Sequence, residues 1–178
     1  MKTTIILFLS LISISCFGQE TVKQDSLKSL DQLSFMKGTW TGDGWMFINR
    51  EKKEFTQTET ISSKVDNTVF MVDGIGYAKE NKDKVIHNAF GVISYNVKEK
   101  SITMISFSST GGKMENPIKL IGPKKLEWSF KDEKGGTIRF REDFSEDGFW
   151  IEKGDYSFDG KKWIPFFQMR LKSIPNKH

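Results

Sequence analysis

Two acidic residues near the C-terminus, Glu142 and Glu152, have the spacing to face each other across a β-hairpin. Asp147-Gly148 is a strong turn signal, and a three-residue loop at 146–148 places Glu142 opposite Glu152. In that register the neighbours on the same face are apolar. Two carboxyl groups facing each other in an apolar interior cannot both ionise cheaply. The pair could therefore bind a cation or a polar ligand group, or serve as acid and base.

Two alternatives remain open for this pair. An Arg or Lys from another strand could neutralise the carboxylates, or a slip of two residues could separate Glu142 from Glu152. The expected inward set is Ile138, Phe140, Phe144, Trp150 and Tyr156. The expected outward set, in water, is Arg139, Arg141, Lys153 and Asp155. Arg139 is expected opposite Asp155 as an exposed ion pair worth ~0–1 kcal/mol.

Other side chains could line the same interior. His87 lies in an early strand, and its same-face neighbours Ala89 and Gly91 are small enough to leave room beside it. A histidine hydrogen-bonded within the barrel wall is the alternative. In the last strand the inward residues are expected to be Trp163, Phe167, Met169 and Leu171. The candidate ligand-binding residues are therefore His87, Glu142, Glu152, Trp150, Tyr156, Phe167 and Met169.

No catalytic residue and no metal site is assigned from the sequence. No Ser/His/Asp order stands out, and pairs of acidic residues are too common to identify a reaction by themselves. The single cysteine, Cys16, excludes disulfides, zinc thiolates and a cysteine nucleophile from the mature fold, which would begin after it.

The segment from Gly38 to Trp45 reads Gly-Thr-Trp-Thr-Gly-Asp-Gly-Trp. A phosphate-binding loop is excluded because no helical pattern follows the glycines. Glycines inside a first strand instead allow a sharp bend at a barrel corner. Gly38, Trp40, Gly42 and Gly44 are therefore expected to form the structural floor of a barrel.

The elements that must position these residues are almost all strands. Their turns contain Gly111-Gly112, Gly122-Pro123 and Gly135-Gly136, which favour short hairpins. The candidate strands are Thr39–Asn49, Glu54–Val65, Thr68–Ala78, Lys84–Asn96, Ser101–Ser108, Met114–Ile121, Lys125–Lys131, Thr137–Phe144, Phe149–Phe158 and Trp163–Lys172. This order predicts an all-β fold, an up-and-down antiparallel barrel of about ten strands over residues 38–172.

One short helix is expected before the barrel. Ser26 to Met36 has leucines at spacing three, with Asp25 or Ser26 available as an N-cap. The helix belongs to an N-terminal extension at 19–37 and is expected to close one end of the barrel. Residues 173–178 are expected to be a frayed, flexible tail.

The first 18 residues are typical of a signal peptide. Lys2 supplies a positive start, and the apolar stretch from Ile5 to Ile14 is too short to span a bilayer. Cleavage after Gly18 would leave Gln19 first, in a periplasmic or secreted protein. Lipidation of Cys16 is the alternative, and a membrane is an expected partner only in that case.

The net charge of the chain is +4, and its basic and acidic residues are interspersed along the sequence. Nucleic acid is therefore not an expected partner.

Several segments together resemble a known group of barrels. They are Leu33 to Gly44 (Leu-Ser-Phe-Met-Lys-Gly-Thr-Trp-Thr-Gly-Asp-Gly), His87 to Tyr95, Gly136 to Phe140, Trp150 to Gly154 and Trp163 to Met169. The chain resembles the lipocalin-like, nitrobindin-like barrels of the calycin superfamily, and in particular an uncharacterised bacterial branch. The resemblance implies a ten-stranded barrel with an apolar cavity and implies no particular activity.

The resemblance also bears on cofactors. Nitrobindin relatives bind haem through a histidine near the C-terminal strands, whereas this chain has only His87 and His178. We therefore expect no haem and no other cofactor. The leading hypothesis is a secreted protein that binds a small apolar or amphipathic molecule. The alternatives are an enzyme, a hydrolase or isomerase, that uses the Glu pair as acid and base, and an envelope scaffold with a filled barrel.

Overall fold

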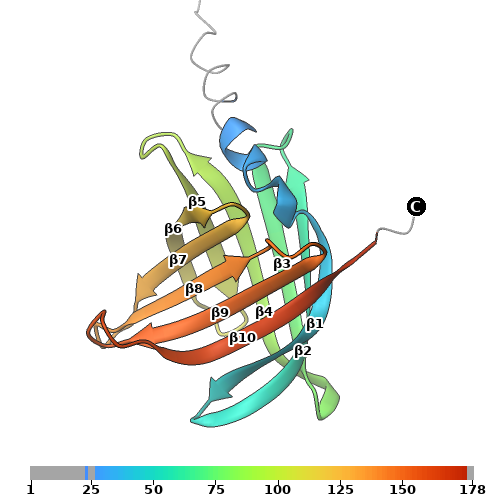
Figure 1. The fold of residues 1–178 in the computed structure, drawn as a ribbon, viewed down its shortest axis with the longest axis vertical. Coiled ribbons are helices and arrows are strands. Elements are labelled where there is room, and N and C mark those ends of the chain that lie inside the picture. The colour runs from blue at the N-terminus through green and yellow to red at the C-terminus, as the bar shows by residue number, and fades with distance from the viewer. Residues whose placement is uncertain (1–22, 24–26, 176–178) are drawn as a thin grey trace, which may run out of the picture.

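The structure is a computed structural model and describes Lys23 and residues 27–175 of the chain. The expected signal peptide, Cys16 and the last three residues of the expected C-terminal tail lie outside the described residues. The described part is a closed antiparallel barrel of ten strands, as the sequence predicted (Figure 1). Each strand pairs with the next in the chain, and β1 closes the ring against β10.

The strand boundaries agree closely with the expected ones. The strands are β1 (Gly38–Ile48), β2 (Glu51–Lys64), β3 (Val69–Ala78), β4 (Asn81–Asn96), β5 (Ser101–Ser108), β6 (Lys113–Gly122), β7 (Lys125–Lys131), β8 (Thr137–Asp143), β9 (Phe149–Ser157) and β10 (Ile164–Ile174). The last strand continues to Ile174, two residues past the expected boundary at Lys172. Ser173 is tied to the barrel because its main-chain N–H donates to the Gly148 carbonyl oxygen at 2.9 Å.

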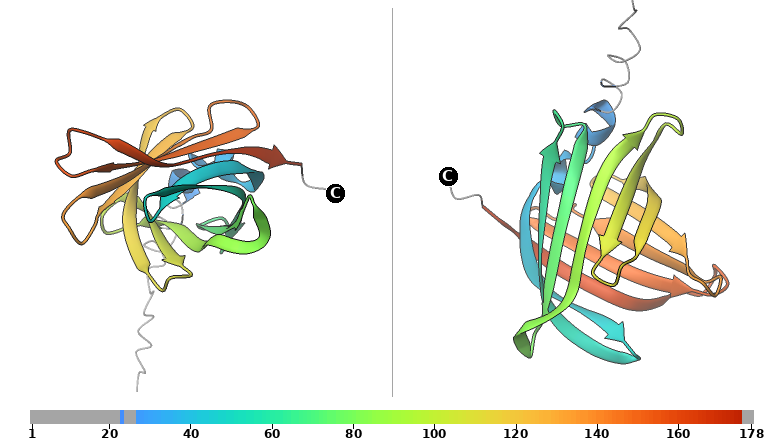
Figure 2. Two further views of the ribbon diagram at one scale, coloured as in Figure 1. Left: turned by 90° about the horizontal axis from the view of Figure 1, so that it is seen from below. Right: turned by 180° about the vertical axis from the view of Figure 1, so that it is seen from behind.

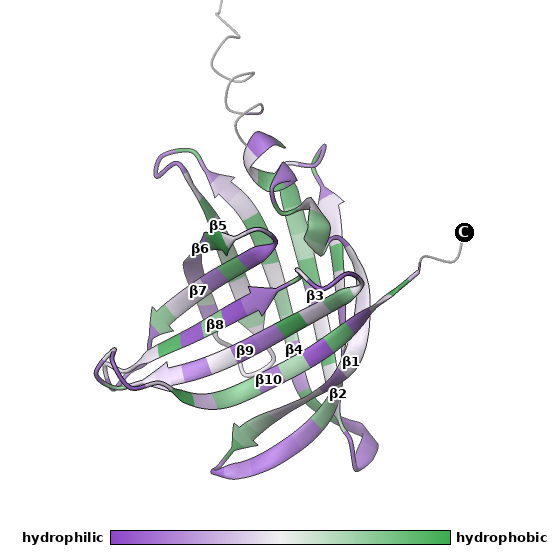
Figure 3. Cartoon of the chain, viewed as in Figure 1, coloured by the Kyte–Doolittle hydropathy of each residue, from purple (hydrophilic) through white to green (hydrophobic). Residues whose placement is uncertain are grey.

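Hydrophobic and hydrophilic residues alternate along the strands, as Figure 3 shows by colour. This period of two places one set of side chains in the lumen and the other on the outer wall. Closure also removes the exposed strand edges that would otherwise pair with other chains. The view along the barrel in Figure 2 shows the strands arranged around a common interior.

The N-terminal segment is less regular than the expected helix from Ser26 to Met36. It has a short helical stretch at 27–31 and then η1, a 3₁₀-helix at Ser34–Met36. Leu33 and Met36 each donate a main-chain hydrogen bond to the residue three positions earlier. The apolar residues of this segment recur every three positions. This spacing matches the three residues per turn of a 3₁₀-helix better than the 3.6 of an α-helix, so tight turns replace one continuous α-helix.

The main core lies where this segment covers one end of the barrel, here called the closed end (Figure 1). Leu30, Leu33 and Met36 are buried there against the barrel residues. Trp40 is 6% exposed, and its ring lies edge-on to Phe144 and Trp150. The turns that join β1 to β2, β3 to β4, β5 to β6, β7 to β8 and β9 to β10 lie at the opposite, open end.

Candidate ligand-binding cavity

The lumen contains a cavity of about 310 Å³. Its walls are mostly aromatic side chains and methionines, with a few polar groups. The lining side chains include Met46, Gln57, Glu59, His87, Trp128, Phe130, Phe140, Glu142, Trp150, Glu152, Phe167 and Met169. Phe47 and Phe107 also line the cavity and are 47% and 43% exposed, so its opening lies near the ends of β1 and β5.

The acidic pair expected from the sequence has the predicted register. Glu142 on β8 lies directly opposite Glu152 on β9, and both line the cavity. They are 7% and 8% exposed. The Trp128 indole N–H donates to Glu142 Oε1 at 3.0 Å, and none of the residues lining the cavity in the described structure is Lys or Arg. The pair is therefore not neutralised by a basic side chain in the lumen.

Burial raises the pKa of both carboxyl groups of this pair. For Glu142, desolvation outweighs the opposing hydrogen bond from Trp128, and repulsion from Glu59 adds to the increase. For Glu152, desolvation is again the main cause, followed by repulsion from Glu142 and from Glu59. The two groups therefore hold protons well above the pH at which an exposed glutamate loses one.

Sequence analysis missed a third carboxyl group in the same cavity, that of Glu59 on β2. It is 7% exposed, and the amide nitrogen of Gln57 donates to its Oε1 at 2.7 Å. Burial raises the pKa of Glu59 to about 7, against the lowering effect of the Gln57 hydrogen bond and with a contribution from the nearby charge of Asp73. The three carboxyl groups thus form one acid cluster, defined here as Glu59, Glu142 and Glu152.

Two glycines on β3 make room for the side chains on β2. Gly74 pairs with Glu59 and Gly76 with Gln57. A Cβ at Gly74 would lie 2.5 Å from both Glu59 carboxyl oxygens, and one at Gly76 would overlap Gln57 Oε1. A sequence signal existed, because Gln57 and Glu59 share their parity with buried Phe55 and Ile61 on the same strand.

Four buried polar atoms on residues that line this cavity have no hydrogen-bond partner. They are Glu142 Oε2, Gln57 Oε1, Trp150 Nε1 and Ser106 Oγ. Buried polar atoms in folded proteins nearly always have a partner, and an unpaired one costs about 1–3 kcal/mol. The cavity is thus lined with apolar rings but offers unused hydrogen-bonding positions close to the acid cluster.

The other expected ligand-binding residues divide into two groups. His87, Trp150, Phe167 and Met169 all line the cavity. Burial lowers the pKa of His87, so its neutral form is favoured. Tyr156 does not line the cavity, and that part of the expectation is wrong. Its ring packs on Gly136 at the open end, and desolvation and the Asp132 carboxyl group raise the pKa of its phenol.

Trp163 was also expected to face inward and does not. A register shift between Pro165 and Phe167 inserts one residue in β10. Such a bulge reverses which face the preceding residues occupy. Trp163 therefore lies on the outer wall, where the Arg139 guanidinium is stacked 3.6 Å from its ring centre.

The expected floor residues occupy the closed end and the first strand. Gly38 has φ of +135°, a conformation that favours glycine, and Trp40 is buried above it. A Cβ at Gly42 would overlap the Arg170 carbonyl oxygen, and one at Gly44 would lie 2.5 Å from the Phe55 ring. These glycines therefore allow β10 and Phe55 to approach β1 closely.

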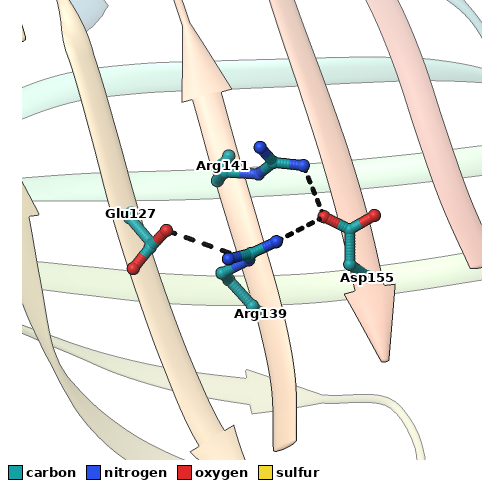
Figure 4. A network of polar contacts seen from close by, with 4 residues as sticks. All are labelled: Glu127, Arg139, Arg141 and Asp155. Carbon is teal, nitrogen blue, oxygen red and sulfur yellow. Dashed lines mark hydrogen bonds and ion pairs between the residues drawn. The ribbon is translucent and has the colours of Figure 1, made fainter. Parts of the chain in front are cut away.

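The outer wall carries a polar network around Asp155, shown in Figure 4. Arg139 and Arg141 each donate to Asp155 Oδ2, at 3.2 and 2.5 Å, and Arg139 Nε lies 3.8 Å from Glu127 Oε2. Arg139 was correctly predicted opposite Asp155. The prediction that Asp155 lies in water is wrong, because it is only 7% exposed beneath these side chains.

Among the described residues, no group of three or more His, Cys, Asp and Glu side chains is arranged to hold a metal ion. None of the described helices is long and apolar enough to cross a membrane.

No protein-family model and no curated protein sequence matches this chain. The solved structures that are similar to it include the following two. Rv2717c from M. tuberculosis has a TM-score of 0.59 and 12% identity, covering 83% of this chain and 98% of its own. The S-type phycobiliprotein lyase CPES from Guillardia theta has a TM-score of 0.56 and 11% identity, covering 88% and 98%. These likenesses support the lipocalin-like barrel fold, and the particular bacterial branch stays a prediction.

Proposed function

We propose that this protein binds a small, mainly apolar molecule in the lumen of its barrel and does so outside the cytoplasm after export. The observation that carries the proposal is the cavity of about 310 Å³, whose aromatic walls surround polar atoms that have no partner. Pockets that hold small molecules are typically apolar with a few convergent polar groups. The apolar stretch near the N-terminus supports export.

Similarity of fold alone does not identify the function. One neighbour is named as a phycobiliprotein lyase, and the same kind of barrel is used for different activities. The cavity argues against a scaffold whose barrel is filled by its own side chains. The acid–base enzyme remains the second candidate, because Glu142 and Glu152 face each other with raised pKa values.

The decisive experiment is native mass spectrometry of the protein purified from its own host. We expect a small molecule to be retained under native conditions and lost on denaturation. A protein that carries no molecule, and whose lumen takes up no apolar fluorescent probe, would contradict the proposal. Conversion of the retained molecule on incubation would favour the enzyme.

A matched pair of variants tests whether the bound molecule lies in the lumen. A Cβ at Gly91 would have ordinary contacts, with Val72 Cβ at 3.5 Å and Met104 Sδ at 3.7 Å, so Gly91→Leu should fill the cavity without breaking the wall. Gly112→Leu makes the same change in the exposed β5–β6 turn. We expect the first variant to lose the molecule and the second to keep it.

A further inference from the structure

We propose that the ligand carries a cationic nitrogen, such as a protonated amine, which is held between Glu59, Glu142 and Glu152 while its apolar part extends toward the open end. This inference rests on the proposed function and adds the chemical class of the ligand. The acid cluster supplies negative charge in the lumen. Outside the cluster, the buried side chain of Gln57, 2% exposed, lines the same cavity and has an oxygen without a partner.

Two of the four unpartnered atoms are a carboxyl and an amide oxygen, and both accept hydrogen bonds once a bound cation has displaced the proton of Glu142. Glu142 Oε1 is engaged by Trp128, and its Oε2 has no partner. Gln57 uses its amide nitrogen on Glu59, which leaves its carbonyl Oε1 free. An ammonium group has three donors and no acceptor, so it complements free acceptors better than a hydroxyl or a carboxylate does.

The charges around the cavity also favour a cation. The titratable side chains that line it are Glu59, His87, Glu142 and Glu152, and Asp73 adds a further negative charge near Glu59. His87 is driven toward its neutral form by burial. No Lys or Arg is among the lining residues of the described structure, so a bound carboxylate would have no counter-charge there. A cation would offset the cost of burying these carboxylates, which is the main cause of their raised pKa values, and would also relieve the repulsion between them.

The placement of the groups suits an amphiphile that enters with its charged end first. On β9, Glu152 is two residues from Trp150, which packs against Trp40 at the closed end. On β8, the inward residue on the other side of Glu142 is Phe140, whose ring stacks on Trp128 with 4.4 Å between centres. Aromatic faces next to carboxyl groups attract cations and also cover an apolar chain. The aromatic and methionine side chains thus extend from the acid cluster toward the opening near Phe47 and Phe107.

The test compares three probes of equal chain length, decylamine, decanol and decanoic acid, below the concentrations at which they form micelles. Isothermal titration calorimetry with the delipidated full protein near neutral pH should rank decylamine first. We expect its affinity to exceed that of decanol by roughly tenfold or more, with decanoic acid weakest. Titrations in phosphate and Tris buffers should also show net proton release with decylamine and none with decanol, because the bound cation lowers the carboxyl pKa values.

Variants assign the preference to the acid cluster. In the triple variant Glu59→Gln, Glu142→Gln, Glu152→Gln, the advantage of decylamine and its proton release should vanish while decanol still binds. Glu115→Gln, an identical change at an exposed position on β6, should leave both unchanged. Circular dichroism establishes that each variant is folded, and retained decanol binding shows that the cavity is intact.

The outcomes separate this inference from the function on which it rests. Equal binding of decylamine and decanol, or an amine preference that survives in the triple variant, would overturn the inference and leave lumen binding supported. Preference for decanoic acid would overturn it as well. Failure of all three probes to bind would contradict both the inference and the proposed function. Single variants can replace the triple one if it does not fold, since each should reduce the amine preference.

Discussion

The indole N–H of Trp40 donates to the main-chain carbonyl oxygen of Met36 at 2.9 Å, and this bond joins the N-terminal segment to the first strand of the barrel. Both residues are buried, and the Trp40 ring also contacts Phe144 and Trp150. A single side chain thus satisfies a main-chain acceptor at the end of η1 and fills the closed end of the barrel.

The first prediction follows from this contact. Trp40→Ala should lower the free energy of unfolding by about 3–5 kcal/mol, the range for truncating a core aromatic residue. Trp40→Phe should cost less, because much of the aromatic packing is kept although the hydrogen bond and part of the ring are lost. Urea unfolding followed by circular dichroism gives the measurement. Trp45→Ala is the control on the same strand, since Trp45 lies on the outer face beneath Lys52 and should matter much less.

The second prediction concerns the network in Figure 4. Asp155→Ala leaves two arginines without their shared acceptor in a largely covered position, so we expect a loss of about 1–3 kcal/mol of stability. Glu146→Ala removes an ion pair to Arg170 in which both side chains are about half exposed, and should destabilise the protein much less than Asp155→Ala. Equal effects of the two substitutions in urea unfolding would contradict the role given to burial.

Local patterns were enough to predict the β8–β9 hairpin. The turn at Asp147-Gly148 sets the register, and the alternation of charged and apolar residues sets the faces, so Glu142 could be placed opposite Glu152 from sequence. The information needed was contained within adjacent strands. Ten strands in chain order then require a barrel or a sandwich, and short hairpins favour the up-and-down barrel that is observed.

The features that sequence analysis missed depend on distant or irregular geometry. The bulge lies directly after Pro165, a residue that marks bulges or edges within a sheet, and it moves Trp163 from the lumen to the outer wall. Trp163 then covers Arg139, whose bond to Asp155 contributes to the burial of that carboxylate. The parity of β2 indicated that Glu59 faces inward, but the space for its carboxyl group depends on Gly74 in the neighbouring strand, and the β2–β3 register that brings them together is not shown by one strand alone.

The third prediction concerns the N-terminus, which lies outside the described residues. We expect the mature protein to begin at Gln19 because the preceding segment has the features of a cleaved signal peptide. Edman sequencing or intact mass measurement of protein from the native host tests this. A mature chain that starts with an acylated Cys16 would contradict it and would place the protein on a membrane instead.

The last prediction is that the ligand-free protein becomes less stable as the pH rises from about 5 to about 8. In the unfolded chain, glutamates lose their protons near pH 4.5. In the folded protein, Glu59 has a pKa of about 7, and the pKa values of Glu142 and Glu152 are raised as well. Between these limits the folded state binds more protons than the unfolded state, so stability must fall with increasing pH.

Two other ionisable side chains, His87 and Asp143, also affect how stability depends on pH. His87 opposes the carboxyl effect, and Asp143 acts at lower pH. Burial lowers the pKa of His87, so its contribution is lost as the pH falls through 6.5 and partly offsets the carboxyl effect. Asp143, with a pKa of about 2, contributes stability that disappears only in more acidic solution. Each buried carboxyl group changes stability by up to about 1.4 kcal/mol per pH unit, so the decrease should be measurable.

Urea unfolding at a series of pH values tests this with the ligand removed. Glu142→Gln should flatten the decrease and raise stability at about pH 8, because the variant has no carboxyl group to ionise at that buried position. Glu115→Gln, on the outer wall, should keep the pH dependence of the unchanged protein. Stability that rises through this range, or that has the same slope in Glu142→Gln, would show that the acid cluster is not buried as described. Adding a cationic ligand should reduce the loss most at the upper end of the range, where the carboxyl groups are most readily ionised.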